Sequence, residues 1–322
     1  MSTESTFTLP DGQQVYSKTW KPDGALRAVL VLIHGFSDHC NTYYDLFPSL
    51  ASSGIEVRAF DQRGWGRTVK TKKDRGNTGD TAQVLSDMHS FITSTAAYAQ
   101  DTKIPLFLVG HSMGGGQALT YILHPESPYH SATKPTLAGV LIWSPLITLD
   151  PSSQPGKITI IAGRIAARVM PRLQRYSPLD PGLISRNESV TKNYEADELC
   201  HDTGTLQGLK GMLDRGLWLE EAGVEFYEKA GYVPLWIGHG VEDKITSFEA
   251  TKALGAYHTL HAELPETTAK FTRDVSDWLL ARCPAPVSSE AVSGLGESNV
   301  KSEQKVAADP SKTDSEVSKA KL

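Results

Sequence analysis

The chain has 322 residues, 39% of them hydrophobic and 21% charged, and a formal net charge of -5. This composition fits one large globular domain or a domain with an insertion, and it excludes the broad basic field expected of a protein that binds nucleic acid. The three cysteines, Cys40, Cys200 and Cys283, are far apart and lack metal-ligand spacing. We therefore expect neither a disulfide framework nor a zinc site, and a reducing compartment such as the cytoplasm.

The N-terminal segment has no basic stretch followed by an apolar run, and no segment is long and apolar enough to cross a bilayer. We expect a soluble or peripherally attached protein. The first predicted element is a pair of short strands in FTLPDGQQVYSKTWKP, joined at a turn formed by Asp11 and Gly12.

Continuous apolar runs follow at regular intervals. Residues 28–34 read AVLVLIH, as expected of a strand buried on both faces, and similar runs occur at 54–61, 104–112, 138–145 and 233–240. Helical patterns lie between them, in YYDLFPSLASS, AQVLSDMHSFITSTAAYAQ and GGGQALTYILH. This alternation predicts an α/β fold with a doubly wound, mostly parallel sheet.

The alternation stops between residues 146 and 232, where the sequence is helical in patches without a strand run. We interpret 146–232 as a cap inserted above the carboxyl ends of the strands, and 1–145 and 233–283 as the two parts of the core. Part of the cap mixes apolar and basic residues: Ile158, Ile160, Ile161, Ile165, Val169 and Met170 with Arg164, Arg168 and Arg172. This mixture is compatible with a membrane or lipid surface and equally with a lid helix packed on the core.

Residues 284–322 are rich in Ser, Lys, Glu, Asp and Pro and contain no aromatic residue, so we predict a disordered tail. The tail ends in Ala320-Lys321-Leu322, a near variant of the Ser-Lys-Leu peroxisomal address. A peroxisomal location is therefore an alternative to the cytoplasm.

The pentapeptide GHSMG, residues 110–114, stands between an apolar strand and a Gly-rich helix start. A G-x-S-x-G motif in this context predicts a nucleophile elbow, with Ser112 as nucleophile and the Met113 N–H as an oxyanion donor. A chance match in a Gly-rich turn would not supply the preceding buried strand. Phe36, after the strand that ends at His34, is the natural second oxyanion donor, whereas His34 itself is expected to shape the loop.

A serine nucleophile needs a histidine base and a carboxylate that orients it, in the chain order Ser, acid, His for this fold class. Asp243 follows a late strand and is our choice of acid, with Glu242 as its rival. His258 and His261 are the only histidines downstream, whereas His201 and His239 precede the acid and break the expected order.

Together, HGFSDHCNTY, FDQRGWGRT, GHSMGGGQAL, SRNE, HGVEDKIT and GAYHTLHAELPE resemble the monoacylglycerol lipases of the α/β-hydrolase superfamily, over about residues 5–282 and most of all the fungal members. The resemblance implies a triad of Ser112, Asp243 and His258, with Phe36 and Met113 as oxyanion donors. It also implies that Asp38 and His261 hold the glycerol moiety, where Thr42 replaces a basic residue of the family. It further implies a cap that shields an acyl tunnel and a position at a membrane or lipid droplet.

Only residues 244–257 separate Asp243 from His258. A helix and a last parallel strand normally occupy this interval, and a parallel crossover alone needs about a dozen residues or more. SFEATKAL can form a short helix, but no apolar run follows it, so we predict that the last strand is missing. The final helix, PETTAKFTRDVSDWLLA, keeps an apolar stripe of Phe271, Val275, Trp278 and Leu279. Three explanations are open: a truncated or misjoined gene product, a working enzyme with a rebuilt edge, or a fold retained without catalysis.

The leading hypothesis is a serine ester hydrolase that cleaves monoacylglycerols to glycerol and fatty acid, without metal or organic cofactor. One alternative keeps this chemistry for a lysophospholipid or a short acyl ester. Another is a catalytically impaired, lipid-binding protein on a hydrolase fold, because the spacing between Asp243 and His258 is short.

Overall fold

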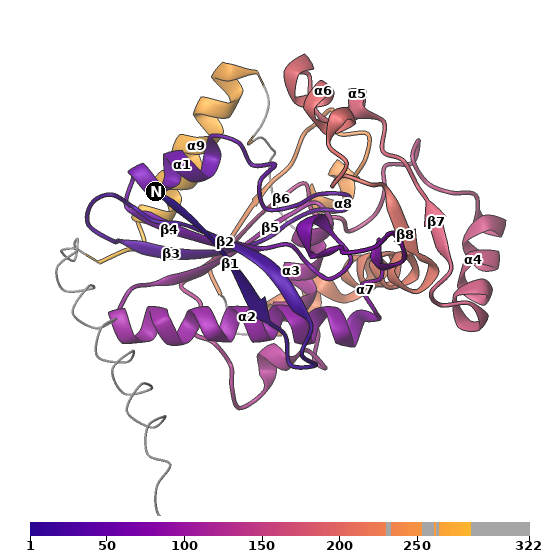
Figure 1. The fold of residues 1–322 in the computed structure, drawn as a ribbon, viewed down its shortest axis with the longest axis horizontal. Coiled ribbons are helices and arrows are strands. Elements are labelled where there is room, and N and C mark those ends of the chain that lie inside the picture. Colours follow the sequence, from indigo (N-terminus) through magenta and orange to yellow (C-terminus); the bar gives the residue numbers. More distant parts are fainter. Residues whose placement is uncertain (230–232, 253–260, 262–263, 285–322) are drawn as a thin grey trace, which may run out of the picture.

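The computed structural model describes residues 1–229, 233–252, 261 and 264–284. Its centre is a seven-stranded sheet in the order β1-β2-β4-β3-β5-β6-β9 (Figure 1). The strands are β1 (Ser2–Thr8), β2 (Gln14–Trp20), β3 (Ala28–Ile33), β4 (Ile55–Phe60), β5 (Leu106–His111), β6 (Gly139–Trp143) and β9 (Leu235–Gly238).

The five strands from β4 to β9 run parallel, whereas β2 is antiparallel to both of its neighbours. The predicted two-stranded start is confirmed, and its turn contains Gly12 at φ +86°, a value that favours glycine. The five apolar runs all form strands of the sheet, so the predicted doubly wound α/β fold is confirmed.

Alternate side chains of each central strand enter two separate cores. In β3, Val29, Val31 and Ile33 pack on one face, and Leu30 and Leu32 pack on the other. The first face is covered by α2 (Thr81–Thr102), α3 (Met113–Leu123) and α7 (Leu206–Lys229), and the second by α1 (Leu46–Ser52) and α9 (Pro265–Leu280) (Figure 1). Burial on both faces explains why the strand sequences are continuously apolar.

The segment between β6 and β9 contributes no strand to the central sheet among its described residues. It contains α4 (Lys157–Val169), β7 (Gln174–Tyr176), α5 (Pro181–Ile184), α6 (Glu188–Ala196) and β8 (Thr203–Thr205) before α7. The elements from α4 to β8 project to one side of the sheet, on the right in Figure 1. Helix α7 instead packs against α3 and α2, so the inserted segment both overhangs the core and covers part of it.

Strand β9 pairs with β6 and is the last strand of the sheet within the described residues. After it come α8 (Phe248–Lys252) and α9; residues 253–260 and 262–263 lie outside the described part, and the prediction of a missing strand extends into them. The predicted apolar stripe of α9 is confirmed, because Phe271, Val275 and Leu279 are buried and the Trp278 ring packs edge-on to Phe107.

Within the described residues, no helix has the length and apolar character that a membrane span requires. Residues 285–322 lie outside the described part, so the disordered tail and the address at Ala320-Lys321-Leu322 stay predictions.

Candidate active site

Ser112 lies at the junction of β5 and α3 with φ 52° and ψ -119°, a backbone conformation that non-glycine residues rarely adopt. Its N–H donates to Trp143 O at 3.1 Å, and its carbonyl oxygen accepts from Leu146 N at 2.9 Å. A Cβ on Gly110 would lie 2.5 Å from Gly114 O, so the turn cannot accommodate a side chain there. These features are those of a nucleophile elbow.

The loop after β3 passes directly over this serine. A Cβ on Gly35 would lie 3.3 Å from Ser112 Cβ, and Phe36 contributes to the wall of the same cavity. The fully buried His34 fixes the loop: its Nδ1 bonds to Gly35 O at 2.9 Å and its Nε2 accepts from Gln62 N at 2.9 Å. His34 therefore shapes the loop, as predicted, while Phe36 follows it and Met113 begins α3.

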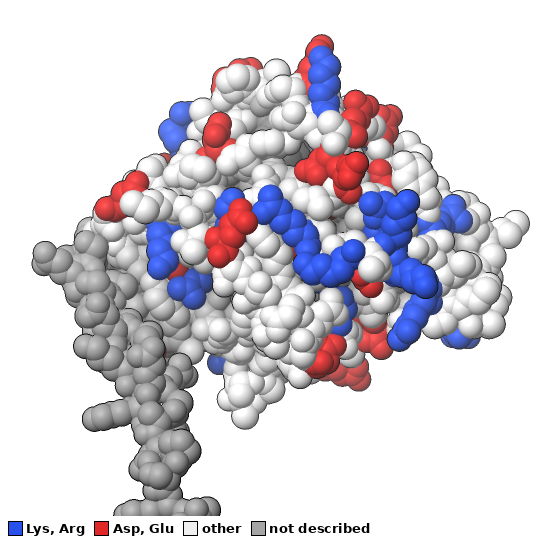
Figure 2. Space-filling model, viewed as in Figure 1, with Lys and Arg blue, Asp and Glu red and all other residues white. Residues whose placement is uncertain are grey.

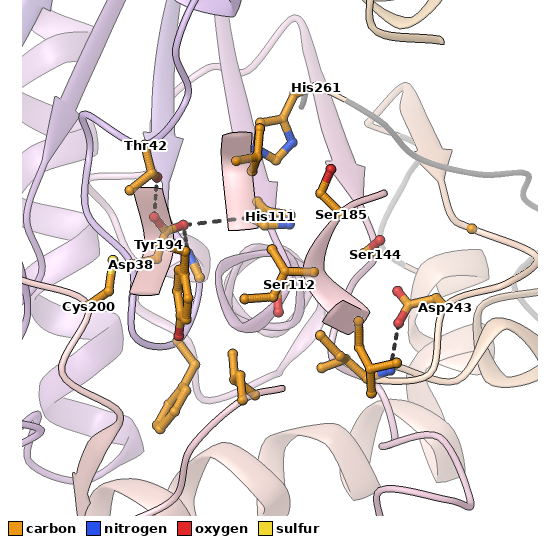
Figure 3. A pocket seen from close by; sticks show the side chains of 18 of the residues that line it. Asp38, Thr42, His111, Ser112, Ser144, Ser185, Tyr194, Cys200, Asp243 and His261 are labelled. Atoms are coloured by element: carbon orange, nitrogen blue, oxygen red, sulfur yellow. Dashed lines mark hydrogen bonds and ion pairs between the residues drawn. The ribbon is translucent and has the colours of Figure 1, made fainter. Parts of the chain in front are cut away.

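A cavity of about 560 Å³ opens over Ser112 between the carboxyl ends of the strands and the inserted segment (Figure 3). Its wall contains the apolar side chains of Leu179, Leu183, Ile184, Val190, Val241 and Ile245. It also contains the polar side chains of Asp38, Asn41, Thr42, Asn193, Tyr194 and His261. A cavity of this kind suits an amphiphilic ligand with its reacting bond near Ser112.

Asp38 is buried at the polar end and is surrounded by neutral donors. Its Oδ2 accepts from Gly35 N at 3.0 Å and from Tyr43 Oη at 2.8 Å, and its Oδ1 accepts from His39 N at 2.7 Å and from the Thr42 hydroxyl. Burial raises the pKa of Asp38, but His111, whose Nδ1 is 3.6 Å away, His34 and the Thr42 hydroxyl together lower it by a larger amount, so the net pKa is well below the usual value. The site therefore holds a fixed negative charge.

His261 lies beside Asp38 and His111 in the same wall (Figure 3). Its Nδ1 accepts a hydrogen bond from Trp143 Nε1 at 2.8 Å, and its ring stacks on Tyr43 with centroids 4.9 Å apart. Burial, and then the neighbouring His111, lower the pKa of His261 well below its usual value. The neutral ring, accepting at Nδ1, carries its proton on Nε2, which makes it a hydrogen-bond donor.

Asp243 follows β9 and also contributes to the cavity wall. Its Oδ1 accepts from Ile245 N at 2.8 Å and Thr246 N at 2.9 Å, and its Oδ2 accepts from the Thr246 hydroxyl at 2.8 Å. Burial raises the pKa of Asp243, but His239 and the Thr246 and Ile245 donors lower it below the usual value. Glu242, the rival acid, is exposed. Of the two candidate acids, Asp243 is the one whose carboxylate is partly buried and fixed by hydrogen bonds.

The structure brings Ser112, Phe36, Asp38, Asp243 and His261 to one cavity. His258, the predicted base, lies outside the described residues. Sequence reasoning missed the aromatic and histidine neighbours of Asp38 and His261, which are Tyr43, His111 and Trp143. His111, as part of GHSMG, and Tyr43, as part of HGFSDHCNTY, lie in sequence motifs, but neither motif indicates the contact with Asp38.

One group of possible metal ligands occurs in the described part of the chain: His39, Asp197 and Cys200, whose ligand atoms lie within 4.8 Å of one another. The Asn41 N–H donates to His39 Nδ1 at 3.2 Å, which leaves the ring proton on Nε2, and this nitrogen is 2.8 Å from Asp197 Oδ2. The imidazole already donates this proton to the carboxylate. The proximity of His39 and Asp197 is therefore explained by a hydrogen bond between the core and the inserted segment.

Comparison with known proteins identifies the family to which this fold and site belong. Residues 24–271 match the family described as Hydrolase_4, serine aminopeptidase, S33. A Schizosaccharomyces pombe protein provisionally named a monoglyceride lipase is 32% identical over 286 residues, which cover 82% of this chain and 71% of that protein. The chain belongs to the monoglyceride lipase family of α/β-hydrolases.

Other members of this family agree with that assignment. The monoglyceride lipase of Homo sapiens is 28% identical over 293 residues, which cover 84% of this chain and 88% of the human protein. The crystal structure of a soluble variant of monoglyceride lipase from Saccharomyces cerevisiae, in complex with a substrate analog, superposes with a TM-score of 0.78. That match is 24% identical and covers 88% of this chain and 96% of the yeast chain, so it supports the fold. Membership of the family makes the chain a hydrolase.

Proposed function

We propose that this protein is a serine hydrolase that cleaves monoacylglycerols to glycerol and a free fatty acid. The observation that carries the proposal is the position of Ser112, on a strained elbow in a cavity lined by both apolar and polar side chains. An acyl chain suits the apolar side chains, and a glycerol head suits the polar ones. Relatives named as monoglyceride lipases over most of the chain support the same substrate.

In this proposal the Ser112 hydroxyl attacks the ester carbonyl, and His258 accepts the serine proton. Asp243 orients the histidine and stabilises its charged form. The N–H groups of Phe36 and Met113 donate to the oxyanion of the tetrahedral intermediate. His258 then protonates the departing glycerol oxygen. In the second half of the reaction, His258 takes a proton from a water that attacks the acyl carbonyl, and it returns this proton to Ser112 Oγ as the bond to the fatty acid breaks.

The charges of the cavity favour a neutral head group. Four carboxylates contribute to the described wall, from Asp38, Asp197, Glu242 and Asp243, and one guanidinium, from Arg186. Asp38 keeps its charge because its pKa is lowered by its donors, despite the opposing effect of burial. A phosphate would be repelled, whereas glycerol hydroxyls can donate to Asp38 and accept from His261 Nε2. The lysophospholipid alternative is therefore less favoured than monoacylglycerol.

Replacing the nucleophile tests the proposal. Ser112→Ala is expected to lower kcat for a monoacylglycerol by about 10⁶-fold, as loss of a serine nucleophile does. Ser131→Ala, at an exposed serine far from the cavity, is the matched control and should keep wild-type turnover. Fatty-acid release is measured with a monoacylglycerol, a lysophosphatidylcholine and a short nitrophenyl ester. Undiminished release by Ser112→Ala would contradict the proposal, and a preference for lysophosphatidylcholine would favour the alternative substrate.

We further propose that the protein docks peripherally on a membrane or lipid-droplet surface through α4. Ile158, Ile161, Ile165 and Val169 follow one another at helical spacing, and their exposed fractions are 85%, 60%, 58% and 76%. Ala167, on the opposite side of the helix, is buried. The stripe therefore faces away from the protein, an orientation that suits insertion among lipids.

The charges near α4 suit an anionic surface. Residues 157–176 contain no Asp or Glu, although the whole chain has a net charge of -5. Arg168, Arg172 and Arg175 are exposed in this segment, and Figure 2 shows basic side chains gathered toward this side of the molecule. Basic residues beside an apolar stripe bind anionic lipid head groups.

A further inference from the structure

Asp243 follows β9, which is the last strand at one edge of the sheet within the described residues. β9 has a single described strand neighbour, β6. The loop after β9 is instead attached to the loop after β6: Ser247 N donates to Thr148 O at 2.9 Å, and Asp150 N donates to Ile245 O at 3.1 Å. These bonds fix the backbone on one side of Asp243.

On the other side of Asp243 lies the ring of His239, which is fully buried. Its Nε2 is 3.3 Å from Asp243 Oδ2 and 3.2 Å from Thr246 O. Its Nδ1 is 2.6 Å from Thr251 Oγ1, on α8. The ring thus bridges the loop that carries Asp243 and the helix that follows it.

The partners of the ring indicate where its proton lies. His239 Nε2 is 3.2 Å from Thr246 O and 3.3 Å from Asp243 Oδ2, a carbonyl oxygen and a carboxylate oxygen that can only accept, so the ring proton is on Nε2. Nδ1 of the neutral ring then accepts from the Thr251 hydroxyl at 2.6 Å, and the Thr246 hydroxyl oxygen is a third neighbour of Nε2, at 3.2 Å. The Thr246 hydroxyl donates to the same Oδ2 at 2.8 Å.

We infer that His239 is a positioning residue for Asp243: its Nε2–H, fixed by Thr251, holds the carboxylate in the orientation that the catalytic histidine requires. This inference rests on the proposed role of Asp243 as the triad acid. The hydrogen bond from His239 is also the largest of the interactions that lower the pKa of Asp243 against the effect of burial. His239 precedes Asp243 in the chain, so it does not fit the order Ser, acid, His of the triad. Its contacts indicate that it orients the acid instead.

Two substitutions of His239 distinguish the roles of its two ring nitrogens. His239→Gln places an amide N–H near the position of Nε2, so it can still donate toward Asp243. His239→Asn places its amide near the position of Nδ1, where it faces Thr251 instead. We expect His239→Asn to lower kcat for a monoacylglycerol by about 10- to 100-fold, the loss typical of groups that orient a catalytic ligand, with KM changed less than about twofold. His239→Gln should recover most of that loss.

A double-variant cycle distinguishes positioning from a general structural role. Asp243→Asn alone is expected to lower kcat by about 10⁴-fold, as loss of the triad acid does. If His239 acts through Asp243, adding His239→Asn to Asp243→Asn should lower kcat by less than about twofold more. A further 10-fold loss in the double variant, or equal kcat for His239→Gln and His239→Asn, would overturn the inference.

Thermal unfolding of each variant shows whether it folds. If His239→Asn does not fold, His239→Gln alone decides: kcat reduced more than about 10-fold in a folded protein would contradict the inference. Wild-type kcat in Asp243→Asn would instead refute the proposed role of Asp243, so failure of the proposed function and failure of the inference give different results.

Discussion

At the residue scale, the polar wall of the cavity over Ser112 contains the buried carboxylate of Asp38. Asp38 is held by backbone N–H groups, two hydroxyls and a histidine, which come from the loop after β3 and from His111 before the elbow. Such a carboxylate stays charged because its donors outweigh the cost of burial. A fixed charge of this kind selects hydroxyl-rich head groups over phosphates.

The ionised state of Asp38 makes the protein sensitive to acid. Because the pKa of Asp38 is lower when folded than the usual value of 3.8, its stabilising effect is complete above about pH 5 and is lost as the pH falls through 3.8 and below. The difference in the free energy of unfolding between wild type and Asp38→Asn should therefore shrink from pH 7 to pH 3. Urea unfolding at these pH values measures it, and a constant difference would contradict the ionised state.

At the element scale, α9 packs against the sheet although only residues 244–257 separate Asp243 from His258. Leu279 has no exposed surface and packs, with Phe271 and Val275, in the core beneath α1. This contact explains why the helix remains attached to the sheet.

Removing that contact should be costly. Leu279→Ala is expected to lower the free energy of unfolding by about 2–5 kcal/mol, the range for a large-to-small change in a core. Leu217→Ala, at a leucine that is 38% exposed on α7, is the matched control and should change it by about 0.5 kcal/mol or less. Equal effects of the two variants in urea unfolding would show that α9 is not seated as described.

The elements that can be predicted from the sequence are those with local sequence patterns. The apolar runs predicted all five parallel strands, and GHSMG predicted the turn at Ser112 because a strand, a tight turn and a helix leave a contiguous pattern. The network around Asp38 could not be predicted, because Tyr43 and His111 come from different elements and meet only in the fold. The role of His239 could not be predicted either, because its contact with Thr251 depends on where α8 packs.

At the scale of the whole molecule, the surface charge is unevenly distributed. The net charge is -5, yet residues 157–176 are basic and carry the exposed apolar stripe of α4. This asymmetry would place the overhanging segment, and with it the cavity, next to a lipid surface from which an acyl substrate can enter.

Lipid docking can be measured by sedimentation with vesicles. The double substitution Ile161→Glu and Ile165→Glu should lower the bound fraction on anionic vesicles, because burying one such side chain contributes about 1.5–3 kcal/mol and so at least about tenfold in affinity. Val224→Glu, at a residue of α7 that is 45% exposed, is the matched control. Equal binding of the two variants would exclude α4 as the docking element. Equal binding of the wild-type protein to anionic and to zwitterionic vesicles would exclude the role of charge.

The most direct test of the account is the reaction of the folded protein with a fluorophosphonate, followed by intact mass and peptide mapping. Only a serine activated by a base is phosphonylated readily. We predict one adduct per chain, on Ser112, with loss of monoacylglycerol hydrolysis in proportion to labelling and with no adduct in Ser112→Ala. A folded wild-type protein that acquires no adduct at Ser112 would contradict the account and favour a hydrolase fold that binds lipid without cleaving it.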